Sequence, residues 1–236
     1  MAKVMNVKCE NCTCVSRGIF CDLDKSMMDE VSRLKVMNFY KKGQTLFTEG
    51  SPNFGLYCIN SGKIKVIKTA PDGKETILRI VGAGDILGHH NILTDEKNQV
   101  TATVIEEGSV CFLDRSFVHN LIAKQPSVAM NIIKKLSYEM MAAENRNANM
   151  NQMNVRERLA DLLISLKTSY GVKEAHRTKL DIKLTREEMA SIVGTANETI
   201  IRFITEFKED GIIAQEGKVI YLLDEYKLNK TANARL

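Results

Sequence analysis

The sequence predicts an α+β protein of three successive parts: an N-terminal β-roll of jelly-roll type, one long helix, and a domain of two short helices and a β-hairpin. Three observations predict this order. Short β-rich runs separated by glycines fill residues from about 39 to 114, a stretch without Gly or Pro follows Pro126, and helix-start signals precede a C-terminal hairpin pattern. We expect a cysteine-rich tail over 1–24, a β-roll over 25–125, a long helix over 126–154 and the helix–hairpin domain over 155–236.

The composition is that of an ordinary water-soluble protein, with 44% apolar and 26% charged residues in a chain of 236. No apolar run is long enough to cross a bilayer, and the first residues do not form a secretory signal, so we expect a cytoplasmic protein. The net charge is only +4. The segment from Asn154 onward is nearly neutral, and this lack of a basic footprint counts modestly against nucleic-acid binding.

The tail contains four of the six cysteines: Cys9, Cys12, Cys14 and Cys21. In a reducing cytosol, clustered cysteines bind metal or perform redox chemistry more often than they form structural disulfides.

The β-roll is predicted from alternation and turn chemistry. The run "KIKVIK" at 63–68 places Ile64 and Val66 on a buried face. The Pro71–Gly73 turn separates it from the next run, because Pro presets φ and Gly accepts positive φ. Further strands are expected in "QVTATVIEE" and "SVCFLDR".

The long helix carries a heptad seam, at spacings of three and four residues, over about three repeats. The seam consists of Ile133, Leu136, Met140, Ala143, Asn147, Met150 and Asn154. A helix of this kind pairs with a second copy, although its small and polar members make the seam weak. The alternative is one amphipathic helix that packs on its own domain.

The C-terminal part contains two capping-box patterns, Thr185 with Glu188 and Thr195 with Glu198. Gly194 lies between the two helices that they would start. Two short helices joined by a Gly-containing turn form a helix-turn-helix, and "GIIAQEG" followed by "KVIYLL" adds a hairpin, or wing. The alternative is a small helical domain without a DNA-binding role.

This order of parts resembles the CRP/FNR family of bacterial transcription regulators. The segments that carry the resemblance are "KKGQTLFTEGS" at 41–51, "GLYCINSGKIKV" at 55–66, "GAGDILG" at 82–88, "NVRERLADLL" at 154–163 and "ANETIIRFITEFKEDGII" at 196–213. The resemblance implies a cyclic-nucleotide-binding-like sensory roll, a homodimer on palindromic double-stranded DNA, RNA polymerase as a partner, and a regulator that is not an enzyme.

The resemblance also assigns base-reading residues. Glu198 and Arg202 match the family motif, and their i, i+4 spacing places them on one side of the recognition helix. Arg reads guanine bidentately and Glu accepts from cytosine. Ile201, where a thymine methyl would be contacted, and Asn197 depart from the two branches of the family. The alternative for Glu198 and Arg202 is a surface ion pair of small energy.

Cyclic AMP is not the expected effector. The family's cyclic-nucleotide branch uses an Arg-Ser pair for the phosphate, and "NQVTATV" at 98–104 has neither residue. A buried phosphate without a cation would be poorly compensated. The adjacent His89 and His90 raise the possibility of heme or metal, but such residues are more often surface or satisfied core histidines.

The FNR branch of the family holds an oxygen-labile [4Fe–4S] cluster with tail cysteines and one distant cysteine on a roll strand. The resemblance therefore implies a cluster held by Cys9, Cys12, Cys21 and Cys111, with Cys14 as an alternate ligand. Cys58 is expected to be core packing. The cluster would control dimerisation through the weak helix seam.

Four alternatives compete with this interpretation. The tail cysteines alone could form a complete site, and a structural zinc ion would also accept four thiolates. A thiol–disulfide switch needs no metal. A protein of a different class, an iron–sulfur electron-transfer module on a dimeric scaffold, would leave the helix-turn-helix unexplained.

Overall fold

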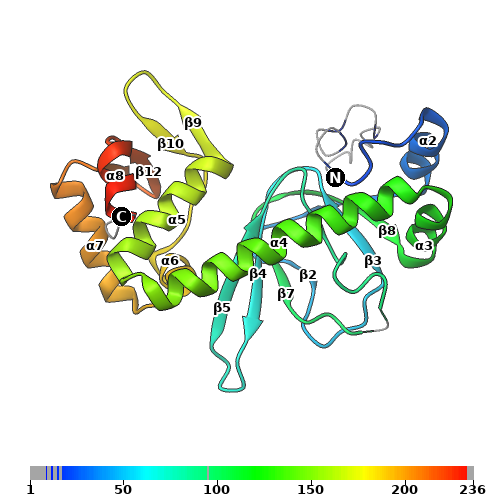
Figure 1. Cartoon of the computed structure of the whole chain (residues 1–236), viewed down its shortest axis with the longest axis horizontal. Coiled ribbons are helices and arrows are strands. Elements are labelled where there is room, and N and C mark those ends of the chain that lie inside the picture. The colour runs from blue at the N-terminus through cyan, green and yellow to red at the C-terminus, as the bar shows by residue number, and fades with distance from the viewer. Residues whose placement is uncertain (1–8, 10–11, 13–14, 16–17, 95, 233–236) are drawn as a thin grey trace. The chain divides into compact units, whose positions relative to one another are not determined.

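The computed structural model describes residues 9, 12, 15, 18–94 and 96–232 of the chain (Figure 1). The chain divides into two compact units, Met1–Ala142 and Ala143–Leu236. In the described part, no helix is both long enough and apolar enough to cross a membrane. The predicted order of β-roll, long helix and helix–hairpin domain is confirmed.

The N-terminal unit is built around two antiparallel sheets. Its described strands are β1 (Val36–Tyr40), β2 (Thr45–Phe47), β3 (Gly55–Ile59), β4 (Lys63–Thr69), β5 (Glu75–Val81), β6 (Ile86–Leu87), β7 (Thr101–Glu106) and β8 (Gly108–Asp114). One sheet has the order β1-β8-β3-β6 and the other β2-β7-β4-β5. The predicted Pro71–Gly73 turn joins β4 to β5, with Gly73 at a φ of 83°.

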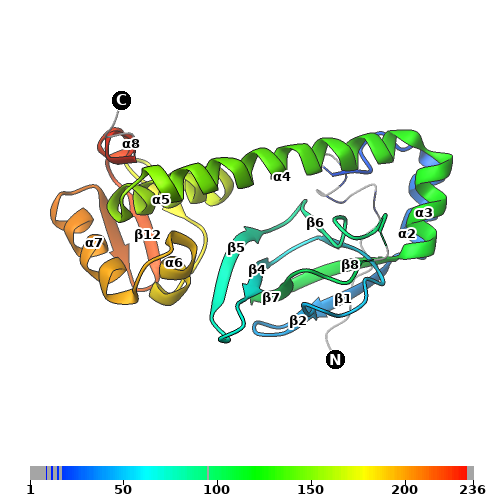
Figure 2. The ribbon, with the colours of Figure 1, turned by 60° about the horizontal axis from the view of Figure 1, so that its bottom comes forward.

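The described helices of this unit are α2 (Lys25–Leu34), α3 (Arg115–Lys124) and the first part of α4 (Pro126–Gln152). The Asp24 carboxylate caps α2 by accepting from the Met27 amide at 2.8 Å, and Asp114 caps α3 through the Ser116 amide at 2.8 Å. Figure 2 shows α2 and α3 beside the start of α4. Helix α4 was predicted from the sequence, whereas α3 was not.

Alternation along β3 and β8 divides the apolar side chains between two cores. Ile59 and Val110 face the interior between the sheets. Leu56 and Leu113 face the opposite way, into a core that also contains side chains of α2, α3 and the start of α4. The outer face of this sheet is therefore buried beneath the three helices.

The long helical pattern is interrupted near its C-terminal end. Helix α4 ends at Gln152, and α5 (Val155–Tyr170) begins after an N-cap at Asn154. The Asn154 side chain accepts from the Glu157 amide at 3.0 Å, and the Glu157 carboxylate accepts from the Asn154 amide at 2.8 Å. The assignment of Asn154 to the heptad seam is wrong, because its side chain caps the next helix.

The C-terminal unit contains the predicted helix pair and hairpin. Its elements after α5 are β9 (Gly171–Lys173), β10 (Thr178–Leu180), α6 (Arg186–Val193), α7 (Asn197–Glu209), β11 (Ile213–Glu216), β12 (Val219–Leu222) and α8 (Glu225–Ala232). Its sheet has the order β11-β12-β10-β9. The β11–β12 hairpin turns at Gly217, where φ is 59°, as predicted. The sequence analysis did not predict β9, β10 or α8.

Candidate functional site

Two cysteines face each other on adjacent strands of the N-terminal unit. Cys58 on β3 is the direct antiparallel partner of Cys111 on β8. Directly opposed residues present their side chains on the same face of a sheet. That face is the one covered by α2, α3 and α4, and Cys58 and Cys111 are only 9% and 6% exposed.

The tail brings two more cysteines to this core. Cys9 is 7% exposed and belongs to the same apolar cluster as Cys58 and Cys111. Its amide donates to Ser32 Oγ on α2 at 3.2 Å. The Cys12 thiol donates to Asn60 Oδ1 at 3.2 Å, just beyond the end of β3. Residues separated by about a hundred positions thus place sulfur atoms around one sheet face, which we call the thiol face (Cys9, Cys12, Cys58 and Cys111).

The electrostatics of the thiol face disfavour an isolated thiolate. The pKa of the Cys111 thiol is raised to about 11, mainly by burial and in smaller part by the nearby Cys12 and Cys9. Lys35, itself only 7% exposed, acts in the opposite direction on the same thiol. A bound metal group would supply the positive charge that thiolates need here, since thiols lose their protons when they bind metal.

Cys21 lies in a different environment. Its side chain is exposed, and its sulfur is 3.7 Å from Asn131 Nδ2 on α4. Burial and the neighbouring Asp22 raise the pKa of its thiol, while Lys134 lowers it. Cys14, the alternate ligand in the sequence analysis, lies outside the described residues.

The thiol face fits a thiolate-held group in its donor chemistry. Among the described residues, no three cysteine sulfurs lie mutually within 4.8 Å. A tetrahedral zinc site with Zn–S bonds of about 2.3 Å would bring its sulfurs to roughly 3.8 Å from each other. No three described thiols are therefore spaced as the sulfurs of a single zinc ion would be.

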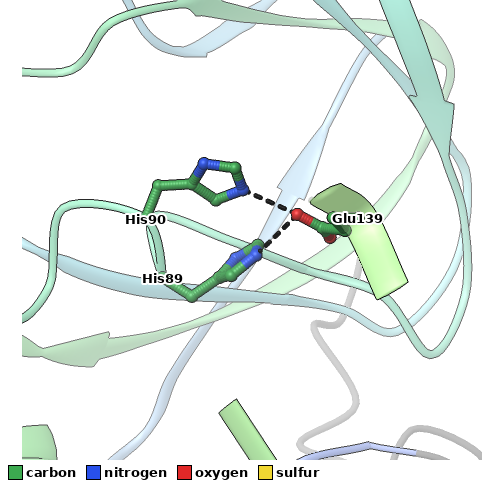
Figure 3. A group of neighbouring side chains, drawn as sticks. All are labelled: His89, His90 and Glu139. Carbon is green, nitrogen blue, oxygen red and sulfur yellow. Dashed lines mark hydrogen bonds and ion pairs between the residues drawn. The ribbon is translucent and has the colours of Figure 1, made fainter. Parts of the chain in front are cut away.

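A second polar cluster of the N-terminal unit centres on Glu139 of α4 (Figure 3). Glu139 Oε2 is 3.0 Å from His89 Nε2 and 2.6 Å from His90 Nε2, and it also contacts Arg79 Nη1. Lys135 Nζ lies 3.5 Å from the other carboxylate oxygen. We call these five residues the Glu139 cluster.

The Glu139 carboxylate is already well compensated. Burial alone would raise its pKa, but hydrogen bonds from both histidines and the charge of Arg79 outweigh this and hold the pKa well below its usual range. Burial lowers the pKa of His89, whose Nδ1 is buried and has no hydrogen-bond partner among the described residues. Although three residues that can bind metal meet here, two cations already neutralise the carboxylate. His89 and His90 were noted in the sequence, but Glu139, which precedes the seam position Met140, was not.

In the C-terminal unit, α6 has the predicted capping box. The Thr185 hydroxyl accepts from the Glu188 amide at 3.1 Å, and the Glu188 carboxylate accepts from the Thr185 amide at 2.9 Å. Gly194 ends α6 in the left-handed conformation, with φ of 72°. A Cβ at Gly194 would lie 2.5 Å from Met150 Cε, the end of a flexible side chain that can move aside, so it is the left-handed φ that favours glycine at this turn.

The second predicted capping box, at Thr195 and Glu198, is wrong. The N-cap of α7 is Ala196, which makes no side-chain cap. The Thr195 amide instead donates to Ala190 O at 3.0 Å and belongs to the end of α6.

The α7 surface places the predicted base-reading residues on its open side. Glu198, Ile201 and Arg202 are exposed, whereas Ile200, Ile204 and Phe207 are buried on the opposite side. The ion pair of Arg202 is with Glu206, at 3.7 Å. Asn197 is half-buried, and its Oδ1 atom is buried without a hydrogen-bond partner.

A β-roll followed by a long helix and a winged helix-turn-helix defines a class of DNA-binding transcription regulators. Residues 37–125 match the model of the cyclic nucleotide-binding domain, and residues 157–231 match that of the Crp-like helix-turn-helix domain. The chain belongs to the CRP/FNR family of transcription regulators, which are not enzymes.

Curated relatives match the chain over nearly its whole length. It is 30% identical to the CRP-like cAMP-activated global transcriptional regulator of Mycobacterium tuberculosis, with 91% of this chain and 96% of that protein covered. It is 26% identical to the fumarate and nitrate reduction regulatory protein of Vibrio cholerae, with 96% and 90% covered. The structure of FixK2 from Bradyrhizobium japonicum shares the fold, with a TM-score of 0.75 at 21% identity, covering 86% of this chain and 99% of that one.

Proposed function

We propose that this DNA-binding regulator senses oxygen or redox state through an iron–sulfur cluster that controls dimerisation and DNA affinity. The observation that carries the proposal is the convergence of Cys9 and Cys12 of the tail on Cys111 of the roll. With a fourth cysteine, these thiols would hold a [4Fe–4S] cluster. The family resemblance offers Cys21 for that position, with Cys14 as its alternate.

The described contacts supply a route from the tail to the long helix. Asn131 of α4 donates to Ile19 O at 3.3 Å and to Asp22 Oδ2 at 2.8 Å. Strand β8, which carries Cys111, ends at Asp114, the N-cap of α3. When bound, the cluster supplies metal–thiolate bonds that hold the polar tail in place. An ordered tail then fixes the start of α4 through Asn131.

The proposed dimer forms along α4. Ile133, Met140, Ala143 and Asn147 of the heptad seam are exposed, as is Met150, while Leu136 packs partly against the core of the N-terminal unit. Because the seam is weak, a bias of about 1–3 kcal/mol from the tail would change dimer and DNA affinity by roughly 5- to 150-fold. Two recognition helices would then lie about 34 Å apart on a palindromic site. RNA polymerase is the proposed further partner.

Cyclic AMP is not the proposed effector. Near the segment where the family binds the phosphate, Asn98 is buried and donates to Ser51 Oγ at 3.1 Å and Pro52 O at 3.2 Å. No arginine occurs between Asn98 and Val104. Calorimetry with cyclic AMP should therefore show no saturable micromolar binding; such binding, coupled to DNA affinity, would overturn this part of the proposal.

The deciding experiment is anaerobic purification followed by iron, sulfide and zinc analysis. We expect about four iron and four sulfide per protomer, a dimer by sedimentation, and tight binding to a palindromic site. Air exposure should yield monomer and weak binding. Zinc in place of iron would indicate a structural site, and the absence of both metals a thiol–disulfide switch. A metal-free protein that is already a tight dimer with full DNA affinity would contradict the proposal that the cluster controls dimerisation.

A further inference from the structure

The family resemblance assigns the fourth cluster ligand to the tail, but the sheet carries a cysteine directly beside Cys111. We infer that Cys58, rather than Cys21, supplies the fourth thiolate of the site. This inference rests on the proposed cluster and names one residue of that same site. In this arrangement the roll supplies Cys58 and Cys111, and the tail supplies Cys9 and Cys12.

The strand register is the first support. Cys58 and Cys111 are Cα partners of an antiparallel pair, a relation that places the two Cα atoms about 4.5–5.5 Å apart. Their neighbours Leu56 and Leu113 are partners in the same register and face the same core. The direction of the Cys58 side chain is thus fixed by two strands and does not depend on the tail.

The approach of the tail is the second support. Cys12 donates its thiol to Asn60, which lies two residues after Cys58 on the same chain segment. Cys9 shares one buried core with both sheet cysteines. Cys12 therefore approaches Cys111 on the side where β3 runs, and a group bound by Cys9, Cys12 and Cys111 would lie within the core that also holds Cys58.

The position of Cys21 is the third support. Its sulfur is exposed and lies beside Asn131 of α4, between Asp22 and the charge of Lys134. The same Asn131 side chain holds the neighbouring Ile19 carbonyl and Asp22 carboxylate. This stretch of the tail is thus attached to α4, whereas Cys9 and Cys12 are attached to α2 and to the end of β3.

Lys35 adds a charge argument. It ends α2, immediately before β1, whose residue Met37 is the strand partner of Cys111. Residues two apart on a strand share a face, so Lys35 extends the line of Met37 toward the thiol face. A buried ammonium group stabilises an anionic centre such as four thiolates around a cluster.

The test compares serine variants of the full-length protein after anaerobic reconstitution. Iron and sulfide per protomer and the cluster absorbance are measured for wild type, Cys58→Ser, Cys111→Ser, and the double variant Cys14→Ser/Cys21→Ser. We expect Cys58→Ser and Cys111→Ser to lose the cluster by at least about fivefold, and the double variant to keep it. Thermal unfolding of each metal-free variant controls for folding.

The outcomes separate the inference from the proposed function. A Cys58→Ser protein that folds and keeps a full cluster overturns the inference but leaves the proposed function standing. So does loss of the cluster in the double variant while Cys58→Ser retains it. If Cys58→Ser fails to fold, the double variant decides: retention supports Cys58 and loss rejects it. Wild type that binds zinc alone overturns the cluster, while the zinc content of the same variants still identifies the thiols. Wild type without any metal overturns both.

Discussion

The thiol face and the Glu139 cluster both lie in the N-terminal unit, yet they differ in what burial has done to them. At the Glu139 cluster, a buried carboxylate has two cations and two imidazoles within reach, and its charge is stabilised. At the thiol face, burial is the largest influence on Cys111 and keeps its thiol protonated. The comparison teaches that a group of ligand-type residues is not by itself a ligand site. The charge of Glu139 in the Glu139 cluster is already balanced by Arg79 and Lys135. At the thiol face, a bound metal group would stabilise the thiolates.

The largest expected effect on oxygen sensing is that of Cys111→Ser. This variant should lose the cluster and with it the 5- to 150-fold coupling between oxygen and DNA affinity, because the tail is no longer tied to β8. DNA binding by anaerobic and air-exposed protein is compared in a titration with a palindromic site. A variant whose oxygen response is intact would show that the thiol face is not the sensor and that the tail alone, or another region, carries the signal.

Glu139→Gln should instead act on stability. Removing the carboxylate leaves Arg79 and Lys135 without their shared anion, and we expect a loss of about 2–4 kcal/mol from the free energy of unfolding. Glu144→Gln, at an exposed position on the same helix, should change stability by less than about 0.5 kcal/mol. Urea unfolding measures both. If Glu139→Gln removes cluster binding and leaves stability unchanged, the two regions have been assigned the wrong roles.

Arg202→Ala tests DNA recognition by α7 rather than the sensor. Its side chain is exposed on α7, and we expect a loss of about 1–3 kcal/mol of specific binding, with relaxed preference at one base pair. Binding to random DNA should change little. The iron content and the oxygen response should match wild type, because neither buried region is touched. Equal losses on specific and random DNA would leave Arg202 with a phosphate contact only.

The Glu139 cluster also predicts a pH dependence of stability. Burial lowers the folded-state pKa of His89 below its ordinary value of 6.5. The contribution of His89 to the free energy of unfolding is therefore complete above pH 6.5 and is lost as the pH falls below that value. The pKa of Glu139 is also lowered, so its contribution is complete above pH 4.5 and lost below it. We expect the free energy of unfolding to fall between pH 7.5 and 5, and His89→Gln should reduce this loss. Stability that rises on acidification over this range would contradict the assignment.

The sequence predicted the two kinds of region unequally, for physical reasons. Strand alternation and the Pro71–Gly73 turn are local signals, and they gave the roll correctly. The N-caps at Asn154 and Ala196 were missed because a cap also depends on how the preceding segment ends. Thr195 is a better N-cap than Ala196 by residue type, but its amide bonds to the end of α6. The prediction that Cys58 packs in the core is confirmed, but its pairing with Cys111 was not predicted, because strand register is a long-range property. Glu139 was missed because its four partners come from β5, the segment after β6, and α4 itself.

Asn147→Leu should separate the sensor from the dimer seam with the smallest free-energy change. Asn147 is exposed at a seam position of α4, and a polar residue there weakens pairing between two helices. Leucine should tighten the dimer by about tenfold, or roughly 1.4 kcal/mol. Air-exposed Asn147→Leu should therefore remain dimeric and bind DNA although its cluster is lost. Asn145→Leu, equally exposed but off the seam, adds the same apolar surface and should still dissociate in air. Sedimentation of both variants before and after oxygen exposure, with iron measured in parallel, decides the matter. If both variants remain dimeric, added hydrophobicity alone is responsible and the heptad seam is not the interface. If Asn147→Leu dissociates like wild type, α4 does not transmit the state of the thiol face through this seam.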